Sequence, residues 1–315
     1  MLKHPKPRLV VSACLGFKAT RYDGSIIHDE IVNTLREFAD LLPICPEVEI
    51  GLEVPRKPLV ITKDEYGIHI VSTEKGEDFS NRMEDFAKSF INKLVEIDGF
   101  IMKSKSPSCG VGDSKIYGKG GAVVGRINGI FTKLVREAFP LLPFESEKRL
   151  LNYEIRRNFL TKIFTIADLR ETLPRAKAKD LIELHRRNKY VLMLYNPHIL
   201  KSLGRLIAEI ASRDLNELKE SYRRMFLEAL SKNPGRASYA NVFTHLYSHI
   251  KDDLTNRERS YILTLIEDYR KGRNLLKTLI IYFRGFIYRL GNEYLAEQRF
   301  IEPYPEKLDK IEEQE

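Results

Sequence analysis

Hydrophobic and polar positions follow two different periods along the first half of the chain. Residues 8–13 (RLVVSA) and 99–104 (GFIMKS) are short apolar runs that precede turns, which is typical of buried strands. The runs PLVIT and GIHIVST flank the polar segment KDEYG and predict a β-hairpin. Short strands therefore recur through the first half.

Amphipathic helices are predicted between these strands. Apolar residues recur at helical spacing over residues 29–42, where Asp29 suits the N-cap position, and again over residues 82–97. Strands and helices alternate in this way in α/β domains. We therefore expect an α/β N-terminal domain with a mostly parallel, Rossmann-like sheet.

The pattern changes to continuous helix after about residue 145. From there to about residue 300, helical patterns follow one another and β-branched alternation disappears. About seven helices are predicted, one of which begins with the capping-box pair Thr255 and Glu258. We therefore predict two domains, an α/β domain over residues 1–145 and an all-α domain over residues 146–315.

Composition narrows the class of protein. The 315 residues are 43 % hydrophobic and 30 % charged, which is typical of a globular protein in water. No apolar stretch approaches the roughly 18–20 residues that span a bilayer, and the apolar run near the start is too short for a signal peptide. We therefore expect a cytoplasmic protein without membrane contact, in which thiols stay reduced.

Positive charge is unevenly distributed. Residues 1–150 hold 22 Lys and Arg against 21 Asp and Glu, so nearly all of the net charge of +8 falls in the second half. A basic helical domain fits contact with RNA or nucleotides. The same charge could also belong to a solvent-exposed helical surface that is rich in Lys and Arg and binds neither RNA nor nucleotides.

The three cysteines occupy similar places in the sequence. Cys14 follows the strand at 8–13, Cys45 follows LLPI, and Cys109 follows the strand at 99–104 after a loop rich in Ser and Pro. The carboxyl ends of parallel strands share one edge of a sheet, where ligands bind. Three thiols at three such ends can therefore meet at one site.

Three converging thiols fit more than one kind of site. A structural zinc ion needs a fourth protein ligand, for which His28 or His69 could serve. Thiolates also suit an iron–sulfur cluster, which normally has four cysteine ligands. With only three, one iron is free to bind substrate as a Lewis acid. The remaining interpretation is three buried apolar thiols that only fill space.

Polar and charged residues surround each cysteine, which a space-filling thiol does not require. In order, the motifs CLG…RYDG, CPE…GL…PR.P and K.SPSCG resemble the thiouracil desulfidase family of TudS-like proteins, over about residues 7–145. The second half is similar to the helical YbgA-like domain of unknown function, through residues 184–206 and 245–262.

This resemblance implies a hydrolase that acts on a C–S bond. Its substrate would be a thiolated pyrimidine such as thiouracil, thiouridine or its nucleotide, and its products the oxo base and sulfide. In the family a [4Fe–4S] cluster sits on three cysteines, which here would be Cys14, Cys45 and Cys109, so one iron has no protein ligand. The soft sulfur of the substrate would bind that iron, and water would attack the C=S carbon.

The same motifs suggest further catalytic residues. Glu47, in CPE, is our candidate for the base that accepts a proton from water. Ser106 or Ser108 would orient the pyrimidine or relay the proton, and the sequence does not decide between them. All three residues also have a structural interpretation. Glu47 could cap a helix or a turn, and Ser106 and Ser108 could close the turn through hydrogen bonds to the backbone.

Three cations complete the predicted site. Lys103 and Arg56 would balance the charge of the cluster and thiolates or bind the pyrimidine oxygen. Arg21 is a weaker candidate for substrate binding, because it can instead pair with Asp23 and hold the first loop in place.

Two other patterns are interpreted structurally. The glycines in YGKGGAVVG lack the lysine and serine of a phosphate-binding loop, so we predict a lid over the pocket. His245 and His249 are spaced like zinc ligands on a helix, but the accompanying glutamate is missing. The competing function is an RNA- or nucleotide-binding protein, in which a zinc ion or an iron–sulfur cluster serves only structure.

Overall fold

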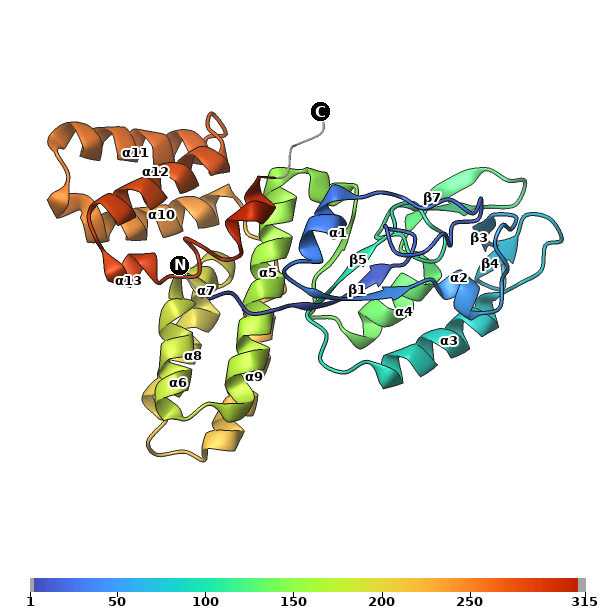
Figure 1. The fold of residues 1–315 in the computed structure, drawn as a ribbon, viewed down its shortest axis with the longest axis horizontal. Coiled ribbons are helices and arrows are strands. Elements are labelled where there is room, and N and C mark those ends of the chain that lie inside the picture. Colours follow the sequence, from blue (N-terminus) through green and yellow to red (C-terminus); the bar gives the residue numbers. More distant parts are fainter. Residues whose placement is uncertain (1–2, 311–315) are drawn as a thin grey trace. The chain divides into compact units, whose positions relative to one another are not determined.

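The computed structural model describes residues 3–310, which form two compact units. The α/β unit comprises residues 6–159 and 307–310, and the helical unit comprises residues 3–5 and 160–306. Helix α5 (Tyr153–Thr172) contributes its first turns to the α/β unit and its remaining turns to the helical unit (Figure 1). The functional domain boundary after residue 145 stays a prediction.

Four parallel strands form the central sheet of the α/β unit, named sheet A here. Their order is β2-β1-β5-β8, of which Figure 1 labels the two central strands, β1 and β5. The bounds are β1 Arg8–Ser12, β2 Asp40–Ile44, β5 Gly99–Met102 and β8 Phe144–Ser146. β1 and β5 are continuous apolar runs because both faces of a central parallel strand are buried. The predicted α/β fold with a mostly parallel sheet is confirmed.

Helices connect the strands and cover the sheet. Their bounds are α1 Glu30–Leu35, α2 Pro46–Glu49, α3 Ser80–Lys93 and α4 Ile130–Ala138. α3 and α4 pack through Phe86, Phe90 and Phe131, whose ring centroids lie 5.5–5.8 Å apart. The helix predicted over residues 82–97 is α3, which starts two residues earlier and ends four residues earlier.

The first predicted helix, residues 29–42, was wrong in its second half. Asp29 caps α1 as predicted, but the helix ends at Leu35. Residues 40–44 form β2 instead, because they pair with β1 along its whole length. Pro43 also lacks the N–H that a continuing helix would need. At residues 40–42, pairing with β1 therefore outweighs the helical spacing of apolar residues from which a helix was predicted.

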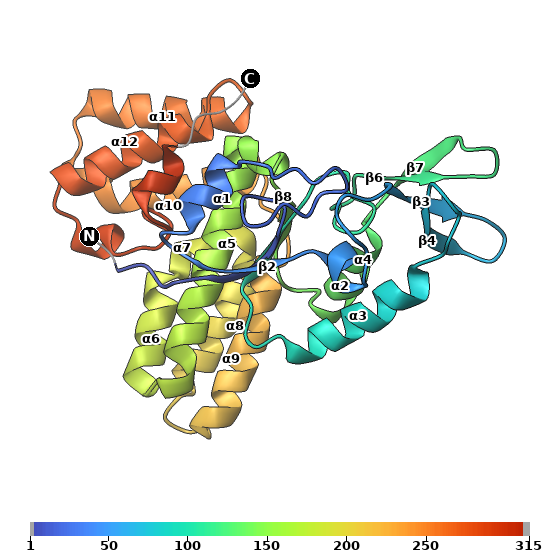
Figure 2. The same ribbon diagram turned by 45° about the vertical axis from the view of Figure 1, so that its right-hand side comes forward.

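A second, mixed sheet in the same unit is named sheet B. Its strands are β3 Leu59–Lys63, β4 Ile68–Ser72, β6 Ser114–Tyr117 and β7 Val123–Ile127. Their order is β4-β3-β6-β7 (Figure 2). The predicted hairpin is the antiparallel pair β3–β4, while β6 pairs in parallel with β3 and antiparallel with β7. β6 and β7 were not predicted as strands, because they are short and interrupted by glycines and charges.

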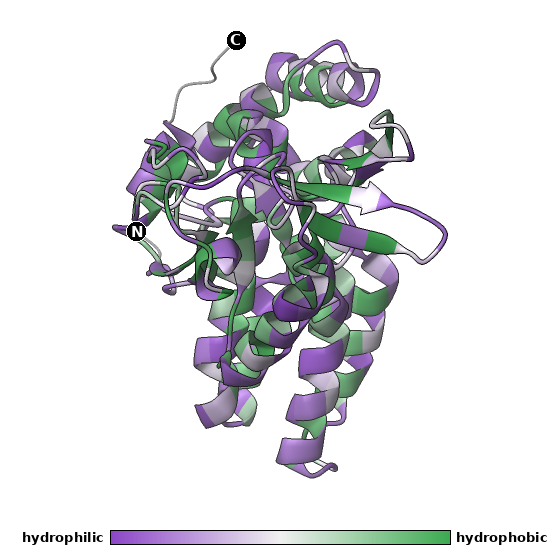
Figure 3. Ribbon diagram, turned by 90° about the vertical axis from the view of Figure 1, so that its right-hand side faces the viewer, coloured by the Kyte–Doolittle hydropathy of each residue, from purple (hydrophilic) through white to green (hydrophobic). Residues whose placement is uncertain are grey.

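Nine α-helices lie between residues 146 and 300 of the described chain, where seven were predicted. Besides α5, their bounds are α6 Ala178–Arg187, α7 Lys189–Tyr195, α8 Pro197–Ala208, α9 Leu215–Leu230, α10 Arg236–Ile250, α11 Asn256–Arg270, α12 Leu276–Arg289 and α13 Glu293–Ala296. Short breaks at Asn188 and Asn196 divide one helical run into three helices. Figure 3 shows hydrophobic and hydrophilic residues alternating on the long helices in view, as expected of amphipathic helices in a bundle.

The core of the helical unit contains a buried ion cluster. Asp168 accepts hydrogen bonds from Nε and Nη2 of Arg187 at 2.9 and 3.0 Å, and from Nδ2 of Asn188 at 3.2 Å. Nη2 of Arg299 lies 3.4 Å from the same carboxylate. This cluster joins helices α5 and α6 to the segment that follows α13. Among the described helices, none combines the length and the apolar character needed to span a membrane.

Candidate active site

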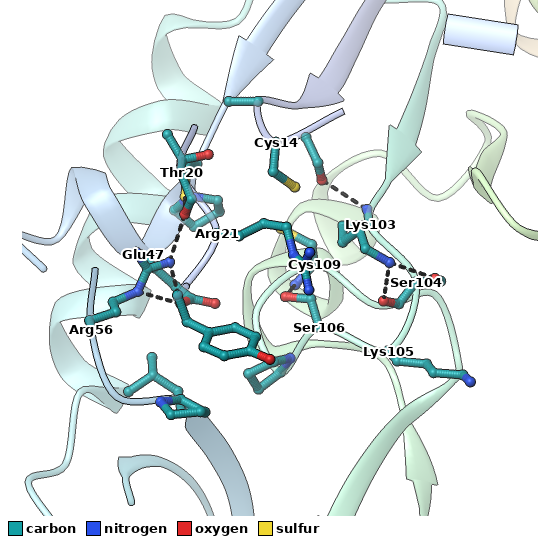
Figure 4. A pocket seen from close by; sticks show the side chains of 18 of the residues that line it. Cys14, Thr20, Arg21, Glu47, Arg56, Lys103, Ser104, Lys105, Ser106 and Cys109 are labelled. Carbon is teal, nitrogen blue, oxygen red and sulfur yellow. Dashed lines mark hydrogen bonds and ion pairs between the residues drawn. The ribbon is translucent and has the colours of Figure 1, made fainter. Parts of the chain in front are cut away.

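One cavity in the α/β unit collects residues from both of its sheets. Its volume is about 470 Å³, and Cys14, Cys45 and Cys109 all line it. Figure 4 labels Cys14 and Cys109 at the cavity. The cavity lies where β1, β2 and β5 of sheet A end, and residues of β3 and β6 form another part of its wall. The strand ends therefore bring all three cysteines of the chain to one place.

Two of the thiols lie within two residues of a strand end. Cys14 lies two residues after β1, whereas Cys45 directly follows β2 and precedes Pro46, the first residue of α2. Cys14 is buried and Cys45 is half-buried. The thiol of Cys45 donates to the carbonyl oxygen of Thr20 at 3.7 Å. Thr20 belongs to the loop after β1, so this contact joins the first two cysteine loops.

The Cys109 turn is closed by Ser106. The Ser106 hydroxyl accepts hydrogen bonds from the backbone N–H groups of Ser108 at 3.2 Å and Cys109 at 3.1 Å. Its carbonyl oxygen accepts from the N–H of Gly110 at 2.9 Å. Ser106 therefore makes the turn-closing contacts that its structural interpretation expects. Since it also lines the cavity, its role toward substrate stays a prediction.

Helix α4 supports this turn from the other side. Gly129, just before α4, lies so close that a Cβ there would come within 2.7 Å of the Cys109 nitrogen and would overlap the Ser108 carbonyl carbon. Backbone atoms cannot swing aside as a flexible side chain can, so only glycine fits. Thr132 of α4 donates from Oγ1 to the Cys109 carbonyl oxygen at 2.7 Å. The position of Cys109 is thus fixed by α4.

Burial changes the acidity of two of the thiols. The pKa of Cys14 is raised to about 12, mainly by burial and then by the nearby Cys45. Burial also raises the pKa of Cys109 well above its ordinary value, although a hydrogen bond with the Ser12 side chain opposes this shift. Metals and clusters bind the thiolate, so ligation here is coupled to the loss of protons.

The donors around the cavity fit an iron–sulfur cluster. His28 and His69, the candidates for a fourth zinc ligand, do not line the cavity, and Nδ1 of His69 instead contacts Asp78 at 2.8 Å. In the part of the chain that the structure describes, no three His, Cys, Asp or Glu side chains are close enough to share one metal ion. A cluster binds each thiolate at a different iron, so its ligands do not need to share one ion. Soft sulfur donors suit such a cluster.

Glu47 is a buried carboxylate with fixed partners. It lies in the first turn of α2, is 8 % exposed and lines the cavity. Oε2 accepts hydrogen bonds from Nε and Nη2 of Arg56, and Oε1 accepts from the Ser108 hydroxyl at 2.8 Å. Arg56 also donates to the Thr20 carbonyl oxygen at 3.0 Å (Figure 4). Two predicted catalytic residues and one predicted cation therefore form a single network.

Lys103 lines the cavity, but its ammonium group faces Glu147. Nζ donates to Oε1 of Glu147 at 2.6 Å. It also donates to the hydroxyl and carbonyl oxygens of Ser104 at 2.8 and 3.0 Å (Figure 4). These contacts use all three donors of an ammonium group. Glu147, directly after β8, also accepts from the backbone N–H of Ser104 at 2.7 Å. The substrate-binding role of Lys103 stays a prediction.

Arg21 makes the local contacts that its structural interpretation expects. Nη1 donates to the Ser25 hydroxyl at 2.7 Å and lies 3.5 Å from the carboxylate of Asp23. The guanidinium group lies 5.6 Å from the ring centroid of Tyr22. Since Arg21 and Tyr22 both line the cavity, contact with substrate stays a prediction.

Sequence reasoning missed three residues of this site. Ser12, the last residue of β1, accepts from the backbone N–H of Lys103 at 2.8 Å and lines the cavity. A polar residue at the end of a predicted buried strand is a signal that could have identified Ser12 as a site residue. Glu147 offered no such signal, because its partner Lys103 lies far away in the sequence. Tyr117 offered none because it lies on β6, which was not predicted as a strand.

The other sequence patterns contribute no residue to the lining of the cavity, apart from Tyr117. The glycine-rich segment forms the β6–β7 turn, in which Gly120 and Gly121 have φ values of 84° and 78°. Only glycine adopts this backbone readily, and movement as a lid stays a prediction. His245 and His249 lie on α10, where the His249 ring is 5.6 Å from that of Tyr294.

In fold and site, the chain is an α/β protein whose three cysteines lie at the carboxyl edge of a parallel sheet. The chain belongs to the 2-thiouracil desulfurase family, whose model matches residues 9–147. A second family model, described as a protein of unknown function (DUF1722), matches residues 189–305. The fusion of two families that the sequence motifs predicted is confirmed.

Three individual proteins are similar to parts of the chain. Uncharacterized protein YbgA of Escherichia coli (strain K12) is 22 % identical over 152 residues, which are 48 % of this chain and 90 % of YbgA. Uncharacterized protein YbbK of Bacillus subtilis (strain 168) is 34 % identical over 111 residues, 33 % of this chain and 74 % of YbbK. The solved structure of the [4Fe-4S]-dependent thiouracil desulfidase TudS is 30 % identical, covers 46 % of this chain and 93 % of its own, and has a TM-score of 0.36. The likeness to this last protein is therefore one of sequence.

Proposed function

We propose that the protein is an iron–sulfur-dependent desulfidase that removes sulfur hydrolytically from a thiolated pyrimidine. The observation that carries the proposal is the meeting of Cys14, Cys45, Cys109 and the buried carboxylate of Glu47 at one cavity. The net reaction converts a C=S group and water into a C=O group and hydrogen sulfide. It balances without an oxidant or a reductant.

Both the family and one relative support this assignment. The family that matches residues 9–147 is described as 2-thiouracil desulfurase. The relative with 30 % identity is described as a [4Fe-4S]-dependent thiouracil desulfidase. We therefore propose the same cofactor here, with thiouracil, thiouridine or its nucleotide as substrate.

Cys14, Cys45 and Cys109 would hold the cluster, which leaves one of its irons without a protein ligand. When bound, such a cluster supplies a Lewis acid for the soft sulfur of the substrate, which makes the attached carbon more electrophilic. The cavity of about 470 Å³ falls within the range of roughly 300–1,000 Å³ that is usual for small-molecule sites.

Glu47 acts as the general base toward the attacking water. A base must lie within hydrogen-bond reach of the proton that it accepts, and Glu47 is the carboxylate that lines the cavity. Arg56 binds Oε2 through two N–H groups, which fixes the orientation of the carboxylate. Ser108 contacts Oε1 and is fully buried, so we assign it to positioning Glu47. Ser106 lines the cavity itself and is assigned to contact with the pyrimidine.

An assay of reconstituted protein tests this function. Protein loaded with iron and sulfide under anaerobic conditions is incubated with 2-thiouracil, 4-thiouracil, and their nucleosides and nucleotides. We expect loss of thiocarbonyl absorbance with release of one sulfide per product. Loaded Glu47→Gln serves as the control and is expected to lose about 10²–10⁴-fold in kcat. If fully loaded wild-type protein converts none of these compounds, the proposed function is wrong.

A further inference from the structure

Part of the cavity wall takes no role in the chemistry described above. The three thiols, Glu47 and the charged networks lie outside sheet B, which contributes Leu59, Val60 and Tyr117 to the wall. Val60 lies on β3 and Tyr117 on β6, and these two strands are paired in parallel. The cavity is therefore built from two sheets of different chemical character.

The register of sheet B fixes the direction in which Tyr117 faces. Thr62 lies opposite Tyr117, and Ile61 lies opposite Ile116. Side chains alternate between the two faces of a strand, so Tyr117 and Val60 point to the cavity while Ile61 and Ile116 point into the core. The 0 % and 4 % exposure of the two isoleucines agrees with this assignment.

A local irregularity shapes the strand end that carries Tyr117. The pairing of β6 with β7 shifts register between Ile116 and Tyr117, and Val124 is the extra residue of β7. Such bulges are common beside active sites, where they change the aim of a side chain. Gly118 accommodates the bulge, since a Cβ there would lie 2.8 Å from Val124 Cγ1.

The chemistry of Tyr117 suits a flat heteroaromatic ring. Its side chain is half-buried at the cavity, and its hydroxyl has no hydrogen bond among the described residues. Tyrosine offers a flat apolar face, and pyrimidines stack on such faces. The other aromatic side chain of the cavity, Tyr22, lies on an irregular loop and already faces the guanidinium group of Arg21.

Resting on the proposed function, we propose that the pyrimidine ring stacks on Tyr117, and that sheet B thereby sets which substrates are accepted. The loops of sheet A then carry the groups that act on the C–S bond and the Ser106 contact with the ring, while sheet B provides the surface on which the ring stacks. Stacking and chemistry would be separable by mutation, because Tyr117 and Glu47 lie on different parts of the unit.

The test uses iron-loaded protein and 2-thiouracil. We expect Tyr117→Ala to raise KM by about 5- to 150-fold, the usual effect of removing one base-stacking side chain, with kcat little changed. Tyr117→Phe keeps the ring and is expected to restore the KM of the wild type. Tyr117→Leu keeps apolar bulk without the ring and should resemble Tyr117→Ala. Tyr66→Ala, on the 86 % exposed tyrosine of the β3–β4 turn, is the matched control and should change nothing.

Equilibrium dialysis of 2-thiouracil against the same proteins separates this inference from the proposed function. If the wild type turns over 2-thiouracil but Tyr117→Leu and Tyr117→Phe have equal KM, the stacking inference is wrong and the proposed function stands. Binding that depends on the Tyr117 ring, without turnover by the wild type, supports the inference and overturns the function. If the wild type neither binds nor converts 2-thiouracil, both are wrong.

Discussion

Arg56 donates two hydrogen bonds to one oxygen of Glu47, from Nε at 2.9 Å and from Nη2 at 2.7 Å. The two side chains are only 8 % and 11 % exposed. A planar guanidinium fork presents both donors in a fixed geometry, which a lysine cannot reproduce. The carboxylate proposed as the base is therefore positioned by one particular neighbour.

Arg56→Lys is expected to lower kcat on 2-thiouracil by about 10–100-fold, because a displaced base loses its alignment with water. KM should change less, since Arg56 acts through Glu47. The double variant Arg56→Lys/Glu47→Gln should be no slower than Glu47→Gln alone, as expected of residues that act together. Independent, multiplied losses in the double variant would contradict the positioning role.

Lys103 and Glu147 form a second charged pair, whose side chains are 19 % and 3 % exposed. Glu147→Gln leaves the Lys103 ammonium without its counter-charge and is expected to lower the free energy of unfolding by about 3 kcal/mol. Replacing both residues, as Lys103→Met/Glu147→Gln, should recover part of this loss. Urea unfolding of the cluster-free protein measures both values. A double variant as unstable as the sum of the single variants would exclude the pairing effect.

Each of Cys14→Ala, Cys45→Ala and Cys109→Ala is expected to lower bound iron and sulfide and to weaken the visible absorbance of the reconstituted protein. His69→Ala is the matched control, because His69 contacts Asp78 and does not line the cavity. It should keep its full iron content. Iron loss in His69→Ala but none in the cysteine variants would place the metal elsewhere.

Gly129→Ala should displace the Cys109 turn, since the added Cβ meets the backbone of residues 108 and 109. We expect a loss of about 1–3 kcal/mol in the free energy of unfolding, the usual cost of overpacking, and a lower iron content. Gly285→Ala, in α12, is the control because a Cβ there meets nothing within 4 Å. It should be neutral or slightly stabilising, as alanine favours helix over glycine. Equal losses in both variants would show that the close approach has no effect.

Asp168 links stability to pH in the helical unit. Burial alone would raise the pKa of this carboxyl, but hydrogen bonds from Arg187 and the charge of Arg299 outweigh it, so the pKa lies below its ordinary value. A pKa that is depressed on folding stabilises the protein above about pH 4, the value of the unfolded chain, and that stability is lost as pH falls through the folded value.

Asp168→Asn is therefore expected to cost about 3–5 kcal/mol at pH 7, with the gap to the wild type narrowing below about pH 4. Asp40→Asn, on a 56 % exposed carboxylate paired with Lys6, is the control and should cost about 0–1 kcal/mol. Urea unfolding at several pH values measures both. A gap for Asp168→Asn that does not depend on pH would contradict the linkage.

Much of the α/β unit could be predicted because its strands are buried on both faces. The sequences of β1 and β5 are mostly apolar, which is the pattern expected of a central strand in a parallel sheet. β2 could not be predicted in this way, since Leu42 also fits the helical spacing of the preceding residues. Only the pairing with β1, a contact between distant segments, decides its conformation.

The candidate site was predictable where its residues lie close to a cysteine in sequence. Glu47, Ser106 and Ser108 are within three residues of a thiol, so the motif alone singles them out. Glu147 lies 44 residues from Lys103, and Tyr117 lies on a strand whose partner is more than 50 residues away. Such long-range neighbours are set by topology, which local spacing does not encode.

The division of the chain into units bears on how it can be dissected. Residues 3–5 fold with the helices, and residues 307–310 fold with the two sheets, so the backbone passes from one unit to the other three times. A single nick after residue 159 would yield two fragments that each retain a short tail belonging to the other's fold. A continuous segment of the chain therefore cannot contain all of one unit without also containing residues of the other unit.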